Sequence, residues 1–100
     1  MAVFRLRPEA DEDLASIWRW TFERWSESQA DDYYDDLSEA MAMLAQEPQR
    51  GRSMHEIDSG LLRYTCKSHV IFYRLADHGI DIVRVLHAKM NWAEHLKDEE

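Results

Sequence analysis

The chain has 100 residues, 45% of them apolar, and a formal net charge of −8 at pH 7. This length suits one domain with a modest core, and the apolar content excludes a disordered chain. No apolar run reaches the roughly 18 residues of a membrane span, and the first residues lack the apolar segment of a signal peptide. We therefore expect a cytoplasmic protein without a membrane partner. Cys66 is the only cysteine, so it cannot form an intramolecular disulfide and is expected to be a small buried hydrophobe.

The charge is unevenly distributed along the chain. Residues 1–47 carry 4 basic and 12 acidic side chains, whereas residues 61–90 carry 5 basic and 2 acidic side chains. Neutralisation of phosphates supplies most of the affinity of proteins for nucleic acid. An acidic total therefore argues against nucleic acid as the main partner.

The first elements are a short strand and a helix. Residues 3–6 alternate weakly, which predicts a strand at a sheet edge or beside the last strand. Pro8 suits the first position of a helix, and Glu9 and Asp11 suit the helix dipole. One apolar stripe follows at spacings of three and four, comprising Ala10, Leu14, Ile17, Trp18, Thr21 and Trp25. Trp20 lies off this stripe, either at a flank of the core or as an exposed aromatic.

A second helix is expected to follow after a very short link. Ser26 and Gln29 form a capping-box pattern, and Pro48 ends the helix at about Gln46. Its apolar stripe comprises Ala30, Tyr33, Tyr34, Leu37, Met41 and Leu44. So short a link predicts an antiparallel helical hairpin that covers one side of a sheet.

The rest of the chain is predicted to build that sheet. Residues 48–60 form a connecting loop that can carry one short helical turn. The dense β-branched and aromatic content that follows predicts strands at residues 61–66, 69–75 and 80–86, and Gly79 can take the positive φ of a tight turn. Residues 91–96 form a possible short helix with Trp92 and Leu96 as docking residues, and residues 97–100 are expected to fray.

These elements predict an α+β fold in a single domain spanning residues 1–100. Its order is β-α-α-β-β-β, with the helical hairpin packed on a mainly antiparallel sheet and a short C-terminal helix at the end.

Several runs resemble a known family. They are Ser68-His69-Val70-Ile71-Phe72-Tyr73-Arg74, Ile82-Val83-Arg84-Val85-Leu86-His87, Arg7-Pro8-Glu9-Ala10 with Asp13-Leu14 and Ile17-Trp18, Trp25 with Gln29-Ala30, and Pro48 with Gly51-Arg52. In this order they closely resemble toxins of the RelE/ParE superfamily, and the ParE branch in particular. The resemblance implies the toxin of a type II toxin-antitoxin system, which inhibits DNA gyrase and acts by binding, without catalysis. It also implies a ParD-like antitoxin as partner, with DNA contacted only through the ribbon-helix-helix end of that antitoxin.

Two other functions remain open. The ribosome-dependent branch of the superfamily cuts messenger RNA, which needs positive charge for the transition state and a group that protonates the leaving oxygen. Arg63, Arg84 and His87 are the candidate ribonuclease set, to which Lys67, Tyr73 and Arg74 could contribute. The third possibility is a non-toxic interaction module.

The candidate binding residues are basic or aromatic. Arg63, Arg74 and Arg84 could form a basic groove for an acidic antitoxin segment or for the target, although Arg84 could equally pair with a carboxylate of the helices. Trp20, Trp25 and Trp92 are candidate anchors, and His87 is a further candidate contact.

No metal or cofactor site is expected. The acidic run at residues 31–36 is interrupted by tyrosines at core spacing, which is typical of a solvated helix face and not of a hard-cation site. His55, His69, His78, His87 and His95 lack zinc spacing, and no cofactor fingerprint is present.

Overall fold

The structure, a computed structural model, describes residues 1–96. Its elements are β1 (Val3–Leu6), α1 (Pro8–Arg24), α2 (Glu27–Gln46), the 3-10 turn η1 (Pro48–Arg50), β2 (Arg52–Ser53), β3 (Leu62–Cys66), β4 (His69–Ala76), β5 (Gly79–His87) and α3 (Trp92–Leu96). The α+β order is confirmed, and the predicted ends of the three long strands are correct to within one residue. The fraying predicted for residues 97–100 lies outside the described residues.

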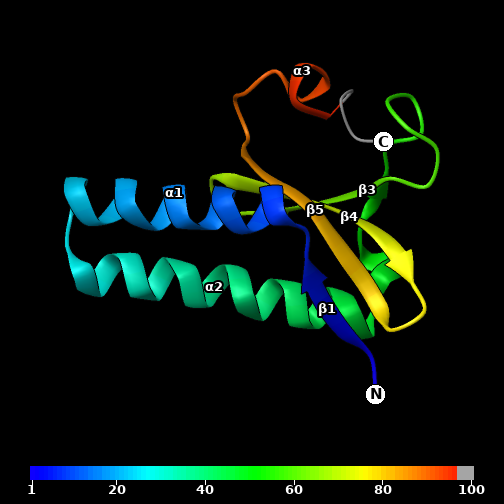
Figure 1. Cartoon of the computed structure of the whole chain (residues 1–100), viewed down its shortest axis with the longest axis horizontal. Coiled ribbons are helices and arrows are strands. Elements are labelled where there is room, and N and C mark those ends of the chain that lie inside the picture. The colour runs from blue at the N-terminus through cyan, green and yellow to red at the C-terminus, as the bar shows by residue number, and fades with distance from the viewer. Residues whose placement is uncertain (97–100) are drawn as a thin grey trace.

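The strands form one mixed sheet in the order β1-β5-β4-β3-β2 (Figure 1). β1 lies at the edge and pairs in parallel with β5, and the other neighbours pair antiparallel. β2 is an addition to the predicted fold. It forms because Arg52 and Ser53 pair with Arg63 and Leu62 of β3, a contact that the irregular residue pattern of this loop does not reveal.

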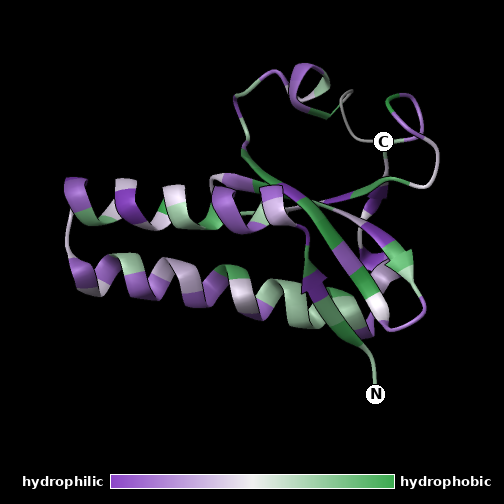
Figure 2. Cartoon of the chain, viewed as in Figure 1, coloured by the Kyte–Doolittle hydropathy of each residue, from purple (hydrophilic) through white to green (hydrophobic). Residues whose placement is uncertain are grey.

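The sheet separates two apolar clusters. The larger one lies under the helical hairpin and includes Leu14, Leu37, Met41, Ile71 and Tyr73. The smaller one lies on the opposite face, where α3 and the loop before β3 cover the sheet; its members are Met54, Leu61, Val70, Phe72, Val83, Leu86 and Leu96. Figure 2 shows apolar residues concentrated in β5 and on the inner sides of the helices. Both faces of the central strands are therefore buried.

The helical hairpin is only partly buried, which corrects the predicted apolar stripes. In α1 only Ala10 and Leu14 are buried, and Trp25 is 67% exposed. Tyr34 of α2 is also exposed. Figure 1 shows the reason, since the hairpin extends well beyond the sheet and its outer turns have no strands beneath them.

Asp13 joins α1 to the sheet. Its carboxylate accepts hydrogen bonds from Nε and Nη2 of Arg84, at 2.8 and 2.9 Å, and from the backbone N–H of Val85 at 2.9 Å. The Asp13 and Arg84 side chains are 15% and 18% exposed. Nη1 of Arg84 also donates to the carbonyl of His95 in α3, so one guanidinium connects α1, β5 and α3.

Asp13→Ala is expected to lower the free energy of unfolding by about 2–3 kcal/mol, because it leaves a largely buried guanidinium and a strand N–H without their acceptor. Urea unfolding followed by circular dichroism measures this loss. The exposed neighbour Glu12 supplies the control, and Glu12→Ala should change the free energy of unfolding by less than about 0.5 kcal/mol. Equal effects of the two substitutions would contradict the role given to Asp13.

Candidate functional site

The main groove lies where the outer part of the hairpin meets the ends of β4 and β5. It encloses about 570 Å³ and is lined by Ser16, Ile17, Trp20, Thr21, Trp25, Tyr33, Ser68, His69 and His87. A smaller hollow of about 360 Å³ adjoins it and shares Thr21, Trp25 and Tyr33. A groove of this size, with aromatic walls and a few polar groups, is typical of a binding site.

His69 and Tyr33 form the floor of the groove. The backbone N–H of Ser68 donates to the Tyr33 hydroxyl at 3.2 Å, and that hydroxyl lies 2.7 Å from Nδ1 of His69. A hydroxyl that accepts from Ser68 has its own proton to donate, and Nδ1 of His69 is the acceptor in reach. This arrangement favours the tautomer of neutral His69 that carries its proton on Nε2. Burial, with a smaller contribution from His87, lowers the pKa of His69 to about 4, so His69 is neutral at physiological pH.

His87 stands beside His69 on the neighbouring strand. The two rings meet edge to face with their centroids 5.3 Å apart. Nδ1 of His87 accepts a hydrogen bond from the backbone N–H of Lys89 at 3.1 Å, which places the proton of neutral His87 on Nε2 as well. The indole N–H of Trp92 donates to the backbone carbonyl of His87 at 3.2 Å and so fixes the chain at the strand end.

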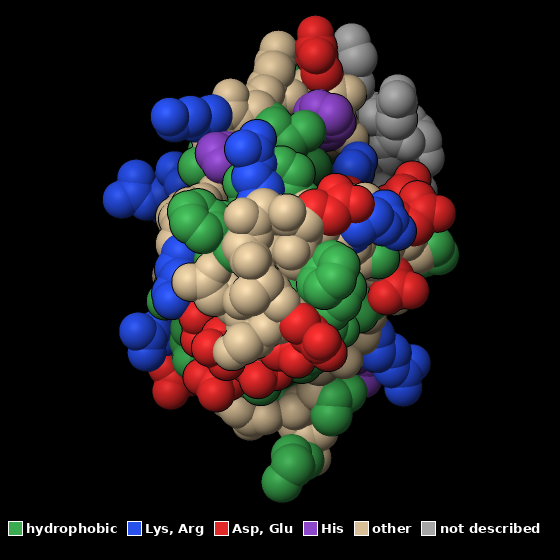
Figure 3. Space-filling view, turned by 90° about the vertical axis from the view of Figure 1, so that its left-hand side faces the viewer, with side chains coloured by type: hydrophobic (Ala, Val, Ile, Leu, Met, Phe, Trp, Pro, Cys, Tyr) green, Lys and Arg blue, Asp and Glu red, His purple; other side chains and the backbone are tan. Residues whose placement is uncertain are grey.

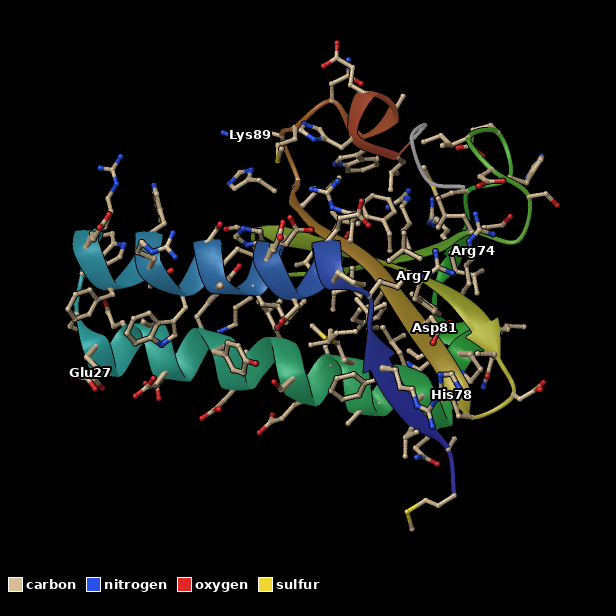
Figure 4. All side chains as sticks on the ribbon, viewed as in Figure 1. Arg7, Glu27, Arg74, His78, Asp81 and Lys89 are labelled. Atoms are coloured by element: carbon tan, nitrogen blue, oxygen red, sulfur yellow. The ribbon has the colours of Figure 1, made fainter. Side chains whose placement is uncertain are left out.

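Charge is divided around the groove. Figure 3 looks onto the end of the hairpin and shows a band of acidic side chains at the height of α2, with histidine and basic side chains above it. The guanidinium of Arg24 lies 4.9 Å from the ring centroid of Trp20, at the groove wall. Lys89 lies where β5 ends, on the opposite side of α1 from α2 (Figure 4). Lys67, beside the smaller hollow, pairs with Asp36 at 2.7 Å.

The groove unites three of the candidate residues, namely Trp20, Trp25 and His87. Trp92 lies elsewhere, packed edge to face on Phe72 and under the guanidinium of Arg63, on the sheet face away from the hairpin. Tyr33 and His69 also line the groove, although neither is among the site residues predicted from the sequence. Tyr33 matched the core spacing of its helix, and the position of His69 at a strand start carries no signal until its partner on α2 is known.

The three candidate arginines share one sheet face, but each has partners within the chain. Arg84 is bound to Asp13 and to His95, which is the pairing that the sequence left open as the alternative. Arg74 donates to the Asp58 carboxylate and to the carbonyl of Ser59. Nε of Arg63 lies 3.1 Å from the sulfur of Met54. These contacts make the arginines part of the packing around α3 and the loop before β3.

The candidate ribonuclease residues are divided between the two sheet faces. Arg63 and Arg84 lie opposite Phe72 in register, on the face that α3 covers, whereas His87 packs against His69 on the hairpin side. Tyr73 is fully buried, its hydroxyl donates to the carbonyl of Pro48 at 2.8 Å, and burial raises its pKa to about 12. These side chains therefore do not surround one site that a substrate phosphate could occupy.

Other chemistry finds no geometric support. Cys66 is partly buried, and burial raises the pKa of its thiol, which opposes thiolate formation. Among residues 1–96 no three His, Cys, Asp or Glu side chains converge to hold a metal ion. Within the same residues, no helix combines the length and the apolar character needed to cross a membrane.

Stability should depend on pH through His69. Its pKa is about 4 in the folded chain and 6.5 when unperturbed, so below about pH 6.5 the unfolded chain takes up a proton that the folded chain does not. Stability is therefore expected to fall as the pH is lowered from about 6.5 towards 4. His69→Asn keeps a side-chain acceptor for Tyr33 but cannot titrate, so its urea midpoint should depend less on pH than that of the unchanged chain. Identical pH profiles would disprove this origin.

The comparisons with known proteins agree with this architecture. Residues 4–92 match the model of a family described as the ParE toxin of the type II toxin-antitoxin system parDE. The chain is 39% identical to Toxin ParE1 of Mycobacterium tuberculosis over 94 residues, which cover 93% of this chain and 96% of the relative. It is 38% identical to Toxin ParE1 of Caulobacter vibrioides over 96 residues, which cover 96% and 99%.

Two solved structures share the fold. A chain of the chromosomal ParDE toxin-antitoxin system of P. aeruginosa superposes with a TM-score of 0.76 at 19% identity, over 89% of this chain and 98% of that chain. A chain of the RelBE2 toxin-antitoxin complex of Mycobacterium tuberculosis gives a TM-score of 0.59 at 20% identity, over 86% and 96%. The family match spans nearly the whole described chain, and the protein belongs to the ParE toxin family of type II toxin-antitoxin systems.

Proposed function

We propose that this toxin acts in the cytoplasm by binding and inhibiting DNA gyrase, and that a ParD-like antitoxin neutralises it. The observation that carries the proposal is the match to the ParE toxin family along residues 4–92, with relatives named Toxin ParE1 at 38–39% identity. The resemblance to the ParE branch implies gyrase as the target.

The geometry supports binding over catalysis. RNA cleavage by general acid–base chemistry needs several charged groups around one reacting phosphate. Here Arg84 is engaged by Asp13, and Tyr73 is buried behind its bond to Pro48. His87, in contrast, faces the groove on the other side of the sheet. An inhibitor that works by occupying a surface needs no such constellation.

The groove supports a protein partner. Trp20 and Trp25 are 54% and 67% exposed, although both are large and apolar. Exposed tryptophans beside a groove are typical anchors in protein interfaces. A ParD-like antitoxin, with a disordered segment that folds on the toxin, could cover them.

The proposed target is tested by a supercoiling assay with purified gyrase and this chain, run with and without the antitoxin. A parallel translation reaction is scored for cleavage of messenger RNA. We expect loss of supercoiling that the antitoxin relieves, and intact messenger. Cut messenger with normal supercoiling would establish the ribonuclease alternative, and no effect in either assay would favour a non-toxic interaction module.

The proposed anchor is tested by comparing two exposed aromatics of α1. Trp20→Ala removes a groove wall and is expected to weaken antitoxin binding about tenfold or more, as loss of a central aromatic anchor does. Phe22→Ala is the matched control, since Phe22 is 45% exposed and stacks on Trp18 outside the groove. Its effect should stay below about threefold in the same calorimetric titration. Equal losses in both variants would show that the groove is not the centre of the interface.

A further inference from the structure

The two histidines of the groove present hydrogen-bond donors with no acceptor. Nδ1 of His87 accepts from the N–H of Lys89, and Nδ1 of His69 lies against the hydroxyl of Tyr33, so the Nε2 atom of each ring is the one that presents an N–H to the groove. Within residues 1–96, no side chain or carbonyl accepts from either Nε2. Neither nitrogen is a fully buried, unsatisfied atom, and both rings line the groove. The two N–H groups are therefore open to whatever fills it.

The Nε2–H tautomer favours a hydrogen-bond acceptor over a metal ion as the ligand of the two histidines. A metal ion at either Nε2 would need the proton moved to Nδ1, which would break the bond from Lys89 or from Tyr33. Two N–H donors on adjacent strands, with ring centroids 5.3 Å apart, instead suit an acceptor with two oxygens. A carboxylate has this form.

The walls of the groove suit a ligand that also carries an apolar side chain and a negative charge. Trp20, Trp25 and Ile17 provide walls for an aliphatic or aromatic side chain. Arg24 lies against Trp20 at the rim, and Lys89 follows His87. The guanidinium of Arg24 on the groove wall, and the greater strength of hydrogen bonds to a charged acceptor, favour a carboxylate over a neutral carbonyl. Asp13, the acidic group that affects His69 most, is engaged by Arg84 and Val85.

We propose that the groove binds a segment of the antitoxin in which an aliphatic or aromatic side chain fills the space between Trp20 and Trp25, while a neighbouring carboxylate accepts hydrogen bonds from Nε2–H of His69 and His87. The antitoxin as occupant rests on the proposed function, whereas the acidic and apolar character of the ligand rests on the groove alone.

The test uses two small probes and the full chain labelled with ¹⁵N. N-acetyl-L-leucine carries an aliphatic side chain and a carboxylate, and N-acetyl-L-leucinamide differs only by an amide in place of that carboxylate. Ring nitrogen signals of His69 and His87 and indole signals of Trp20 and Trp25 are followed during each titration. We expect Nε2–H tautomers in the free chain, saturable shifts at these four residues, and about five- to tenfold tighter binding of the acid, the effect of hydrogen bonds to a charged acceptor.

Two variants of the exposed His87 sharpen the test. His87→Gln keeps an N–H donor at nearly the position of Nε2, and His87→Leu removes it. The preference for the acid should survive at least partly in the first and shrink in the second. Equal binding of the two probes, shifts away from the groove, or no saturable shift at the histidines would overturn the proposal.

The titration contains neither gyrase nor antitoxin, so its outcome is separate from that of the supercoiling assay. A chain that inhibits gyrase but shows no preference for the acid would refute the ligand chemistry alone. A chain that prefers the acid but leaves gyrase unaffected would refute the target alone.

Discussion

The hydrogen bonds between Asp13 and β5 hold α1 and, through Arg84, α3 in place against the sheet. β1 pairs with only the first half of β5, from Gly79 to Ile82, and leaves the second half with an open edge. Beyond the end of β1, at Val85, the Asp13 carboxylate accepts the backbone N–H of β5 in place of a neighbouring strand. The same carboxylate orients Arg84, whose guanidinium reaches across to α3. One side chain thus completes the sheet edge, fixes the angle of α1 and holds the terminal helix.

That arrangement explains why the accessible groove lies at the hairpin and not on the sheet. α3 and the loop before β3 cover one sheet face, and the inner half of the hairpin covers the other. The main groove lies where the hairpin extends past the sheet and meets the ends of β4 and β5. Exposed tryptophans occur at this junction together with two histidine rings whose Nε2 atoms have no acceptor among residues 1–96, and it is here that we propose the antitoxin segment binds.

The strands and helix ends could be predicted because their causes are local. Pro8 starts α1, Ser26 accepts the N–H of Gln29 to cap α2, and Gly79 takes the positive φ of the last turn. The apolar stripe alone placed Trp25 on the core side of α1, because periodicity gives the direction of a side chain but not the extent of the sheet beneath it. The pairing of Arg84 with Asp13 joins residues 71 positions apart, beyond any local pattern. Trp20, Trp25 and His87, named from the sequence as candidate contacts, lie together in the groove, while Tyr33 and His69 meet only through a contact across 36 positions.

The parallel pairing of β1 with β5 delays folding of the toxin until both strands have been synthesised. Val3 is made early but its partner Gly79 is made late, and the main core contains residues of both strands. Contacts between such distant segments delay folding until both are available. His87, which completes the groove, follows at the end of β5. Growing chains therefore lack both a closed core and a finished groove until the residues of β5 have been synthesised.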